Sequence, residues 1–247
     1  MPGDQRATAA LTAAAELGAF FATAPAADPD WAAWSELTEE PAVLGRRLTE
    51  VRDVLSAGPG SYVVDPPVVA STAHLGLVAR LVAPLLGAAL LTGTLPVAPA
   101  ASVRMLLSGS NPLPLAIGSP DAVAVDAPEE LAGALARHWL VPVVAPVGAA
   151  VRAVSGVSPR VLEGNVVSAV AGALRMAGEA RPGLAGRAGD VLDALLRTGP
   201  LAGTGERRDD GGFTRRSCCL FYRLPGAGTC GDCILRHGAR SSTRTPA

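Results

Sequence analysis

The sequence predicts a mostly helical α+β protein with a small antiparallel strand meander near residues 101–126 and a small, separate C-terminal segment. Three observations support this prediction. Long Ala- and Leu-rich stretches place apolar residues three or four positions apart, as in amphipathic helices. Between 101 and 126, short apolar runs alternate with Gly, Ser and Pro, which is typical of strands and turns. All four cysteines lie close together near the C-terminus.

The composition predicts a compact protein with a sizeable core. The chain has 247 residues, of which 49% are hydrophobic and 17% charged, far from the composition of disordered chains. The formal net charge is −1, so no overall positive field attracts nucleic acid or an anionic membrane. We therefore expect no nucleic-acid partner.

Two helices are predicted in the N-terminal quarter of the chain. The first spans 6–24, where apolar residues recur on one helical face. Thr38 is placed to cap a second helix, whose apolar residues recur every three or four positions up to Leu55. The Gly-Pro-Gly sequence at 58–60 then ends this helix.

A third helix is predicted from about Pro67 to about Leu91, kinked or split at Pro84 because proline lacks the backbone donor. The uncharged run 81–103 is long enough to cross a bilayer. It is interrupted by prolines and glycines, and no second span would satisfy the freed backbone groups. We predict a buried helix followed by a loop and no transmembrane span, while peripheral membrane contact stays open.

The second half of the chain is predicted to contain two or three strands followed by helices. Asp126 begins a capping-box pattern with Glu129, which predicts a helix to about Leu140. Gly199-Pro200 ends the helical region. Periodicity predicts further helices at 143–154, 159–178 and 184–197.

The composition changes beyond residue 200. The stretch that follows is polar, rich in glycine and without periodicity, which is typical of a linker. We therefore predict one domain over 1–200, and a linker plus a metal-binding, cysteine-ligated segment over 201–247. Residues 238–247 are predicted to be a disordered tail.

The four cysteines, Cys218, Cys219, Cys230 and Cys233, form the pattern C-C-x10-C-x2-C. A C-x2-C pair can direct two thiolates at one metal centre, and Gly231 can give that turn its freedom. The spacing differs from the plant-type and bacterial ferredoxin spacings. An adjacent pair is also unusual for zinc knuckles, and disulfides are disfavoured in a reducing compartment. The spacing alone leaves an iron–sulfur cluster, structural zinc and disulfides as alternatives.

This cysteine pattern resembles the C-terminus of the FhuF family of ferric-siderophore reductases. Residues 74–96 and 157–175 are similar to two further stretches of that family. The resemblance implies a [2Fe–2S] cluster with Cys218, Cys219, Cys230 and Cys233 as its ligands. It also implies that the larger domain holds a ferric siderophore, whose Fe(III) is reduced by one electron to Fe(II) so that iron is released. Glu163 departs from the large aromatic residue expected beside Gly164.

The partners follow from the same resemblance. The sequence contains no nucleotide or flavin fingerprint, so the cluster requires an external electron donor of the ferredoxin or flavin reductase type. Acidic residues at Asp4 and Glu16 argue against a signal peptide, and we expect a cytoplasmic location. Two alternatives stay open. One is a non-redox binding or scaffold protein with structural zinc, and the other is an iron–sulfur sensor of iron or redox state.

Residues 201–247 contain eight arginines against four acidic residues, a local net charge of +4. These arginines could favour the reduced cluster, or attract an anionic chelate or an acidic donor, although single surface charges are usually only solvated. They are Arg207, Arg208, Arg215, Arg216, Arg223, Arg236, Arg240 and Arg244.

No catalytic residue is predicted. Arg160, Asn165 and Arg175 are candidates for lining a substrate cleft, because they lie on one predicted helix in a family-like stretch. The histidines His74 and His138 are expected to be structural, and His237 is expected to lie near the cluster or in the tail without ligating it. The tryptophans Trp31, Trp34 and Trp139 are expected in the core.

Overall fold

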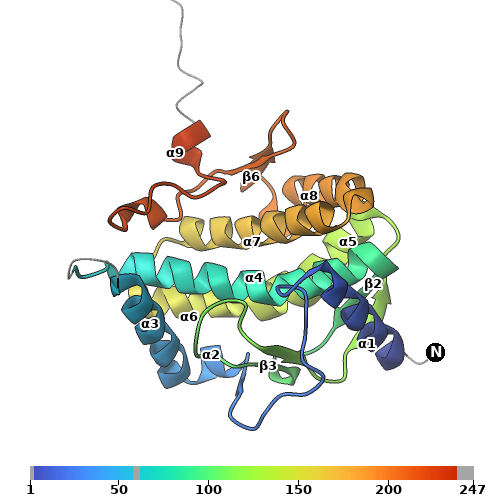
Figure 1. The fold of residues 1–247 in the computed structure, drawn as a ribbon, viewed down its shortest axis with the longest axis horizontal. Helices are drawn as coiled ribbons and strands as arrows, with labels where there is room; N and C mark the ends of the chain where they lie inside the picture. Colours follow the sequence, from blue (N-terminus) through green and yellow to red (C-terminus); the bar gives the residue numbers. More distant parts are fainter. Residues whose placement is uncertain (1–2, 58–61, 238–247) are drawn as a thin grey trace, which may run out of the picture.

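The computed structural model describes residues 3–57 and 62–237, and helices dominate it (Figure 1). The predicted end of a helix at 58–60 and the predicted disordered tail at 238–247 lie outside the described residues. The helices are α1 (Gly3–Ala14), α2 (Glu36–Glu39), α3 (Pro41–Ser56), α4 (Pro66–Thr92), α5 (Pro128–Leu135), α6 (Ala145–Ser155), α7 (Pro159–Ala180), α8 (Ala185–Arg197) and α9 (Ile234–His237).

Helix α4 is the centre of the fold and packs along α7 (Figure 1). Most of its residues are buried, in keeping with its nearly uniform apolar composition. Of the two predicted outcomes, a kink or a split at Pro84, the split is excluded because the helix is continuous through this residue. Proline removes one backbone hydrogen bond, but dense packing on all sides of α4 compensates for that loss.

Two helices, Pro66–Thr92 and Pro128–Ser155, are long and apolar enough to cross a membrane by length and composition alone. Such a test is also passed by core helices, and most of the first helix is buried within the protein. This observation is weak support for a membrane span.

The strands are short and antiparallel. Strand β3 (Val103–Met105) pairs with β1 (Ala32–Ala33) and with β4 (Leu115–Ile117) in one sheet. Strand β5 (Asp121–Ala124) pairs with β2 (Thr94–Val97) in another. The predicted strands near 101–126 are therefore confirmed, but they do not form one meander, because two of them pair with distant segments.

Several predicted boundaries differ from the structure. Helix α1 and the 3-10 turn after it end at Leu17, so the first helix is shorter than predicted. Thr38 does not cap the second helix; it lies in α2 and its hydroxyl donates to the Ser35 carbonyl at 2.7 Å. The reason is Pro41, which occupies the first turn of α3.

The capping carboxylate of α5 is Glu130 rather than Glu129. Its Oε2 accepts the backbone N–H groups of Asp126 and Ala127 at 3.0 and 3.1 Å. A π-helix over Ala136–Val144 joins α5 to α6 in one helical run, where two separate helices are predicted. Helices α7 and α8 confirm the predictions at 159–178 and 184–197.

The stretch with linker composition is folded. Strands β6 (Gly205–Arg207) and β7 (Phe213–Arg215) form an antiparallel hairpin. The hairpin contacts α8 and α7, and the C-terminal segment that follows it lies over α7 in Figure 1. The residues with linker composition therefore contain a folded hairpin. The division of the chain into two domains stays a prediction.

Candidate iron–sulfur site

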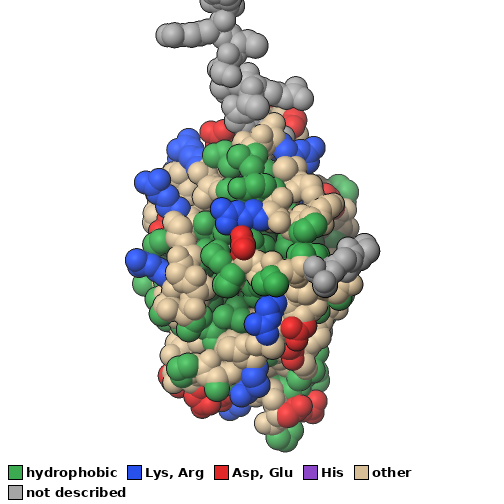
Figure 2. Space-filling view, turned by 90° about the vertical axis from the view of Figure 1, so that its left-hand side faces the viewer, with side chains coloured by type: hydrophobic (Ala, Val, Ile, Leu, Met, Phe, Trp, Pro, Cys, Tyr) green, Lys and Arg blue, Asp and Glu red, His purple; other side chains and the backbone are tan. Residues whose placement is uncertain are grey.

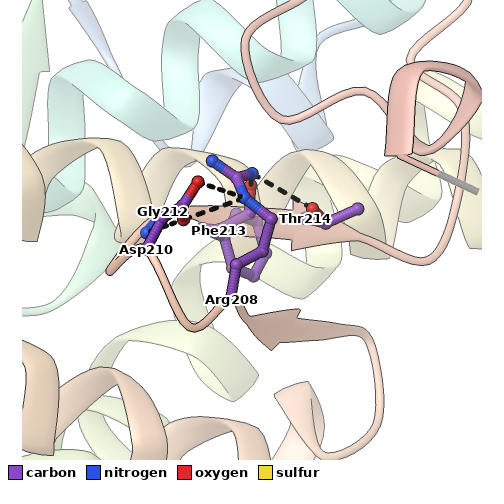
Figure 3. A network of polar contacts seen from close by, with 5 residues as sticks. All are labelled: Arg208, Asp210, Gly212, Phe213 and Thr214. Atoms are coloured by element: carbon purple, nitrogen blue, oxygen red, sulfur yellow. Dashed lines mark hydrogen bonds and ion pairs between the residues drawn. The ribbon is translucent and has the colours of Figure 1, made fainter. Parts of the chain in front are cut away.

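The hairpin that leads into the cysteines is held by Arg208 (Figure 3). Its Nε donates to both carboxylate oxygens of Asp210 at 3.1 and 3.3 Å, and its Nη1 donates to the Phe213 carbonyl at 2.7 Å. Asp210 also accepts the Gly212 N–H at 2.8 Å, which shapes the turn. These contacts hold the β6–β7 turn in shape and so determine the direction in which the chain leaves β7 towards Cys218.

The loop between the two cysteine pairs is folded back by residues with left-handed backbone. Leu220 has φ +68°, and Gly226 and Gly228 have φ +75° and +69°. Glycine adopts such angles without steric cost. Gly231 is not among the residues with positive φ, whereas Gly226 and Gly228, in the turn-forming sequence 225–228, are.

Apolar side chains dock this loop onto the first turns of α4. Leu224 is buried against Val68, Val69 and Val51, and Phe221 packs against the same cluster. Burying such side chains stabilises the contact by about 1.5–3 kcal/mol each. The cysteine segment is therefore part of the folded protein.

The four thiols gather at this loop. Cys219 and Cys233 are buried, Cys218 and Cys230 are half-buried, and all four are free of disulfides. The Sγ atoms of Cys219 and Cys230 are 3.3 Å apart, close enough for one thiol to donate to the other. The Cys233 N–H donates to the Cys230 carbonyl at 3.3 Å, which closes the C-x2-C turn. One cysteine from each pair is thus already in contact.

The environment makes one of these thiols acidic. The hydrogen bond with Cys230 lowers the pKa of Cys219 to about 6, although burial opposes this effect and Arg215 reinforces it. The same hydrogen bond raises the pKa of Cys230, which keeps the shared proton. Burial raises the pKa of Cys218, against the opposing effects of the Leu220 N–H and Arg215. Thiolate is the form that binds metal.

The donor set has the number and chemistry that a two-iron cluster needs. A [2Fe–2S] cluster takes four thiolates shared between two irons, and four free thiols in one loop supply that number. Four thiolates can also bind one zinc ion, so the number of donors alone does not separate the two.

A buried polar network ties the cysteine loop to α4 and α7. The Ser71 hydroxyl donates to the Cys219 carbonyl at 2.8 Å. Asn165 Nδ2 donates to the Ser71 carbonyl and Oγ at 2.9 and 3.1 Å, and Asn165 Oδ1 accepts from Arg215 Nη2 at 2.9 Å. Ser168 donates to the Asp232 carboxylate. Buried hydrogen bonds of this kind determine how the loop sits on the helices.

Comparison with known families agrees with this geometry. Residues 215–233 match the model of the FhuF 2Fe-2S C-terminal domain. The chain carries an FhuF-like [2Fe–2S] domain. The match confirms the resemblance found at the cysteines, and all four of them lie in the FhuF-like domain, residues 215–233. No curated protein matches the chain.

The three residues proposed to line a substrate cleft are not brought together. Asn165 is fully buried, where it supports the FhuF-like domain through Ser71 and Arg215. Arg160 is exposed. Arg175 is exposed and forms an ion pair with Glu179 at 2.6 Å. Helical periodicity could not distinguish these positions, because each depends on what packs against α7.

The basic residues near the FhuF-like domain form no continuous positive rim. Four of them pair with carboxylates, as Arg207–Asp193, Arg208–Asp210, Arg216–Glu206 and Arg223–Asp65. On the face shown in Figure 2, basic and acidic side chains are interspersed with hydrophobic ones. Exposed Arg236 has no ion pair within the described residues, and Arg240 and Arg244 lie outside them.

The histidines and tryptophans are placed largely as predicted. Trp34 and Trp139 are in the core, and their Nε1 atoms donate to backbone carbonyls at 2.9 Å. Trp31 is also buried. His74 belongs to α4 and its side chain is buried. Burial, and to a smaller extent the charge of Arg215, lowers its pKa to about 4. His138 is half-buried.

A cavity of about 270 Å³ between α6 and α7 ends on His74. Its walls are mainly apolar and include Leu162 and Val166, while Arg152 and Glu163 are its charged lining residues. A larger cavity of about 490 Å³ lies between β5 and α5, lined by Asp126 and Glu130 among others, away from the cysteines. Neither cavity has the basic lining that an anionic chelate would favour.

Two residues important to the site were missed from sequence. Ser71 lies in the apolar first part of α4, where nothing in the sequence pattern indicates a role for it. In the structure its hydroxyl donates to the Cys219 carbonyl. Arg215 appears in sequence as one of two adjacent arginines, and only the structure shows that it is buried and Arg216 exposed.

Proposed function

We propose that this protein is a cytoplasmic ferric-siderophore reductase that converts chelated Fe(III) to Fe(II) by one-electron transfer. The bound [2Fe–2S] cluster supplies a one-electron redox couple. Cys218, Cys219, Cys230 and Cys233 are its proposed ligands. The electron comes from an external donor of the ferredoxin or flavin reductase type. Oxygen-rich chelators favour Fe(III), a hard cation, so that iron held as Fe(II) is released more readily.

One observation carries this proposal. The FhuF-like domain is joined to α4 and α7 through the hydrogen bonds of Ser71 with Cys219 and of Asn165 with Arg215. These helices include most of the stretches 74–96 and 157–175, which resemble the reductase family. A redox domain fixed rigidly against the larger domain suits transfer to a substrate held by that domain.

The residues of this chain have three roles in the proposal. The thiolates hold the cluster, and the lowered pKa of Cys219 makes its deprotonated form available near neutral pH. Leu224 and its apolar neighbours keep the loop closed against α4. Ser71 and Asn165 orient the backbone of the cysteine loop.

The proposal is tested with purified, anaerobically reduced protein. It is mixed with a ferric tris-hydroxamate or a ferric tris-catecholate complex, and Fe(II) is trapped with a chromogenic chelator. Stoichiometric Fe(II) formation is expected from at least one chelate class. Cys233→Ser is expected to abolish it, whereas Arg175→Ala on the surface of α7 should not alter it. If no chelate yields Fe(II) although the visible spectrum bleaches on reduction, the reductase assignment fails.

A further inference from the structure

Arg215 differs from the other buried arginines of the described chain. Its side chain is fully buried at the end of β7, directly before the cysteines. Arg80 is also buried, but its Nε, Nη1 and Nη2 all donate to backbone carbonyls. Arg47 pairs with Glu50 and donates to two carbonyls. Arg80 therefore has a partner for every side-chain nitrogen, and Arg47 has a carboxylate partner, although its Nε is buried without a hydrogen-bond partner among the described residues.

Arg215 is only partly compensated. Its Nη2 donates to Val161 O at 3.2 Å, Asn165 Oδ1 at 2.9 Å and, at the distance limit, Ser217 Oγ at 3.4 Å. Its Nε and Nη1 are buried and have no hydrogen-bond partner among the described residues. A buried charge without compensation is strongly unfavourable, so these two nitrogens point to a missing anionic partner.

No carboxylate side chain of the protein fills this role. Within the part of the chain that the structure describes, no ion pair involves Arg215. The residues outside that part, 1–2, 58–61 and 238–247, include no Asp or Glu. The nearby Asp232 does not pair with the guanidinium. The backbone N–H of Arg215 donates to the Asp232 carbonyl at 3.2 Å, while the Asp232 carboxylate accepts a hydrogen bond from the Ser168 hydroxyl.

The space that Arg215 occupies depends on Gly164 of α7. A Cβ at this position would lie 2.6 Å from Arg215 Nη2, 3.1 Å from its Nε and 1.9 Å from Ser217 Oγ. A side chain at this position would require Arg215 and Ser217 to move. Gly164 and Asn165 together hold the guanidinium under the cysteine loop, within electrostatic range of Cys218 and Cys219.

We infer that Arg215 is the buried counter-charge of the [2Fe–2S] cluster and that it raises the reduction potential of the cluster. The cluster with four thiolates carries about −2 charge when oxidised and about −3 when reduced. A fixed positive charge stabilises the more negative state more, and burial weakens screening by water and salt. Arg216 is exposed and pairs with Glu206 at 3.5 Å, so its charge should have little effect.

The test measures the midpoint potential of the intact protein by anaerobic redox titration, followed by visible absorption and paramagnetic resonance. Arg215→Gln removes the buried charge, and Arg216→Gln is the matched control next to it. Arg215→Gln should make reduction of the cluster at least tenfold less favourable, which lowers the midpoint potential by about 59 mV for one electron. Arg216→Gln should shift it much less. Arg215→Lys keeps the charge and should restore most of the wild-type potential.

Equal potentials for Arg215→Gln and Arg216→Gln would overturn the inference, as would a Lys variant that behaves like the Gln variant. If Arg215→Gln does not retain the cluster, Arg215→Met decides the question. Methionine fills the buried position with an uncharged side chain and leaves the contacts between Asn165 and Ser71 unchanged, so the potential should again fall. An unchanged potential would contradict the inference. No siderophore enters these measurements, so a failure of the proposed reductase activity leaves their result intact.

Discussion

The replacement Asn165→Ala tests whether the buried network holds the cysteine loop to the helices. Asn165 is fully buried and its side chain contacts both Ser71 and Arg215. Ser71 in turn donates to the Cys219 carbonyl. Alanine keeps the helix intact and removes the link between α7, α4 and the FhuF-like domain.

The expected loss follows from the bonds removed. The bond with the Arg215 guanidinium is charge-assisted, and such bonds contribute about 1.5–3 kcal/mol. The donation from Nδ2 to Ser71 is neutral and contributes about 0.5–1.5 kcal/mol. The free energy of unfolding should therefore fall by about 2–4.5 kcal/mol. We expect a loss near the upper end of that range, because the buried Arg215 guanidinium would have one hydrogen-bond partner fewer.

The assay is urea denaturation of the cluster-loaded protein under anaerobic conditions, followed by far-UV circular dichroism and by visible absorption of the cluster. Arg175→Ala is the control on the same helix, because its exposed ion pair with Glu179 contributes about 0.3–0.5 kcal/mol. The midpoint of Asn165→Ala should lie well below that of the control, and cluster loss should occur first. Equal midpoints for the two variants would refute the role assigned to the network.

Two further predictions concern the same region. His74 has a pKa of about 4 when folded and about 6.5 when unfolded, so the unfolded state binds the proton first as the pH falls. The contribution of neutral His74 to the free energy of unfolding should be fully present above pH 6.5 and should fall by about 2 kcal/mol on going to pH 5. This loss should disappear in His74→Gln. If this variant has the same pH profile as the wild type, His74 is not the group responsible. Gly164→Ala brings a methyl group within 1.9 Å of Ser217 Oγ and 2.6 Å of Arg215 Nη2, and should destabilise the protein by about 1–3 kcal/mol in thermal unfolding. Gly172→Ala, in the same helix with open space around it, should be neutral or stabilising, and a similar loss in both variants would show that the contacts with Ser217 and Arg215 are not the cause.

Local pattern alone determined much of this protein. Helices α7 and α8 are present where periodicity predicts them, because their apolar faces recur at helical spacing and are buried as such. The four cysteines lie within sixteen residues of one another, so their proximity in space needs little from the rest of the fold. Chemistry carried by neighbours in the chain can be predicted from the chain.

Tertiary structure decided the features that depend on distant partners. Strands β3 and β5 belong to different sheets because their pairing partners, near 32 and 94, are far from them in sequence. Helix α4 continues through Pro84 because surrounding helices stabilise it from every side. Arg215 and Arg216 are indistinguishable in sequence, yet only Arg215 is buried against Gly164 and Asn165. Burial of a charge depends on what packs against it, and that is determined by contacts that local sequence does not encode.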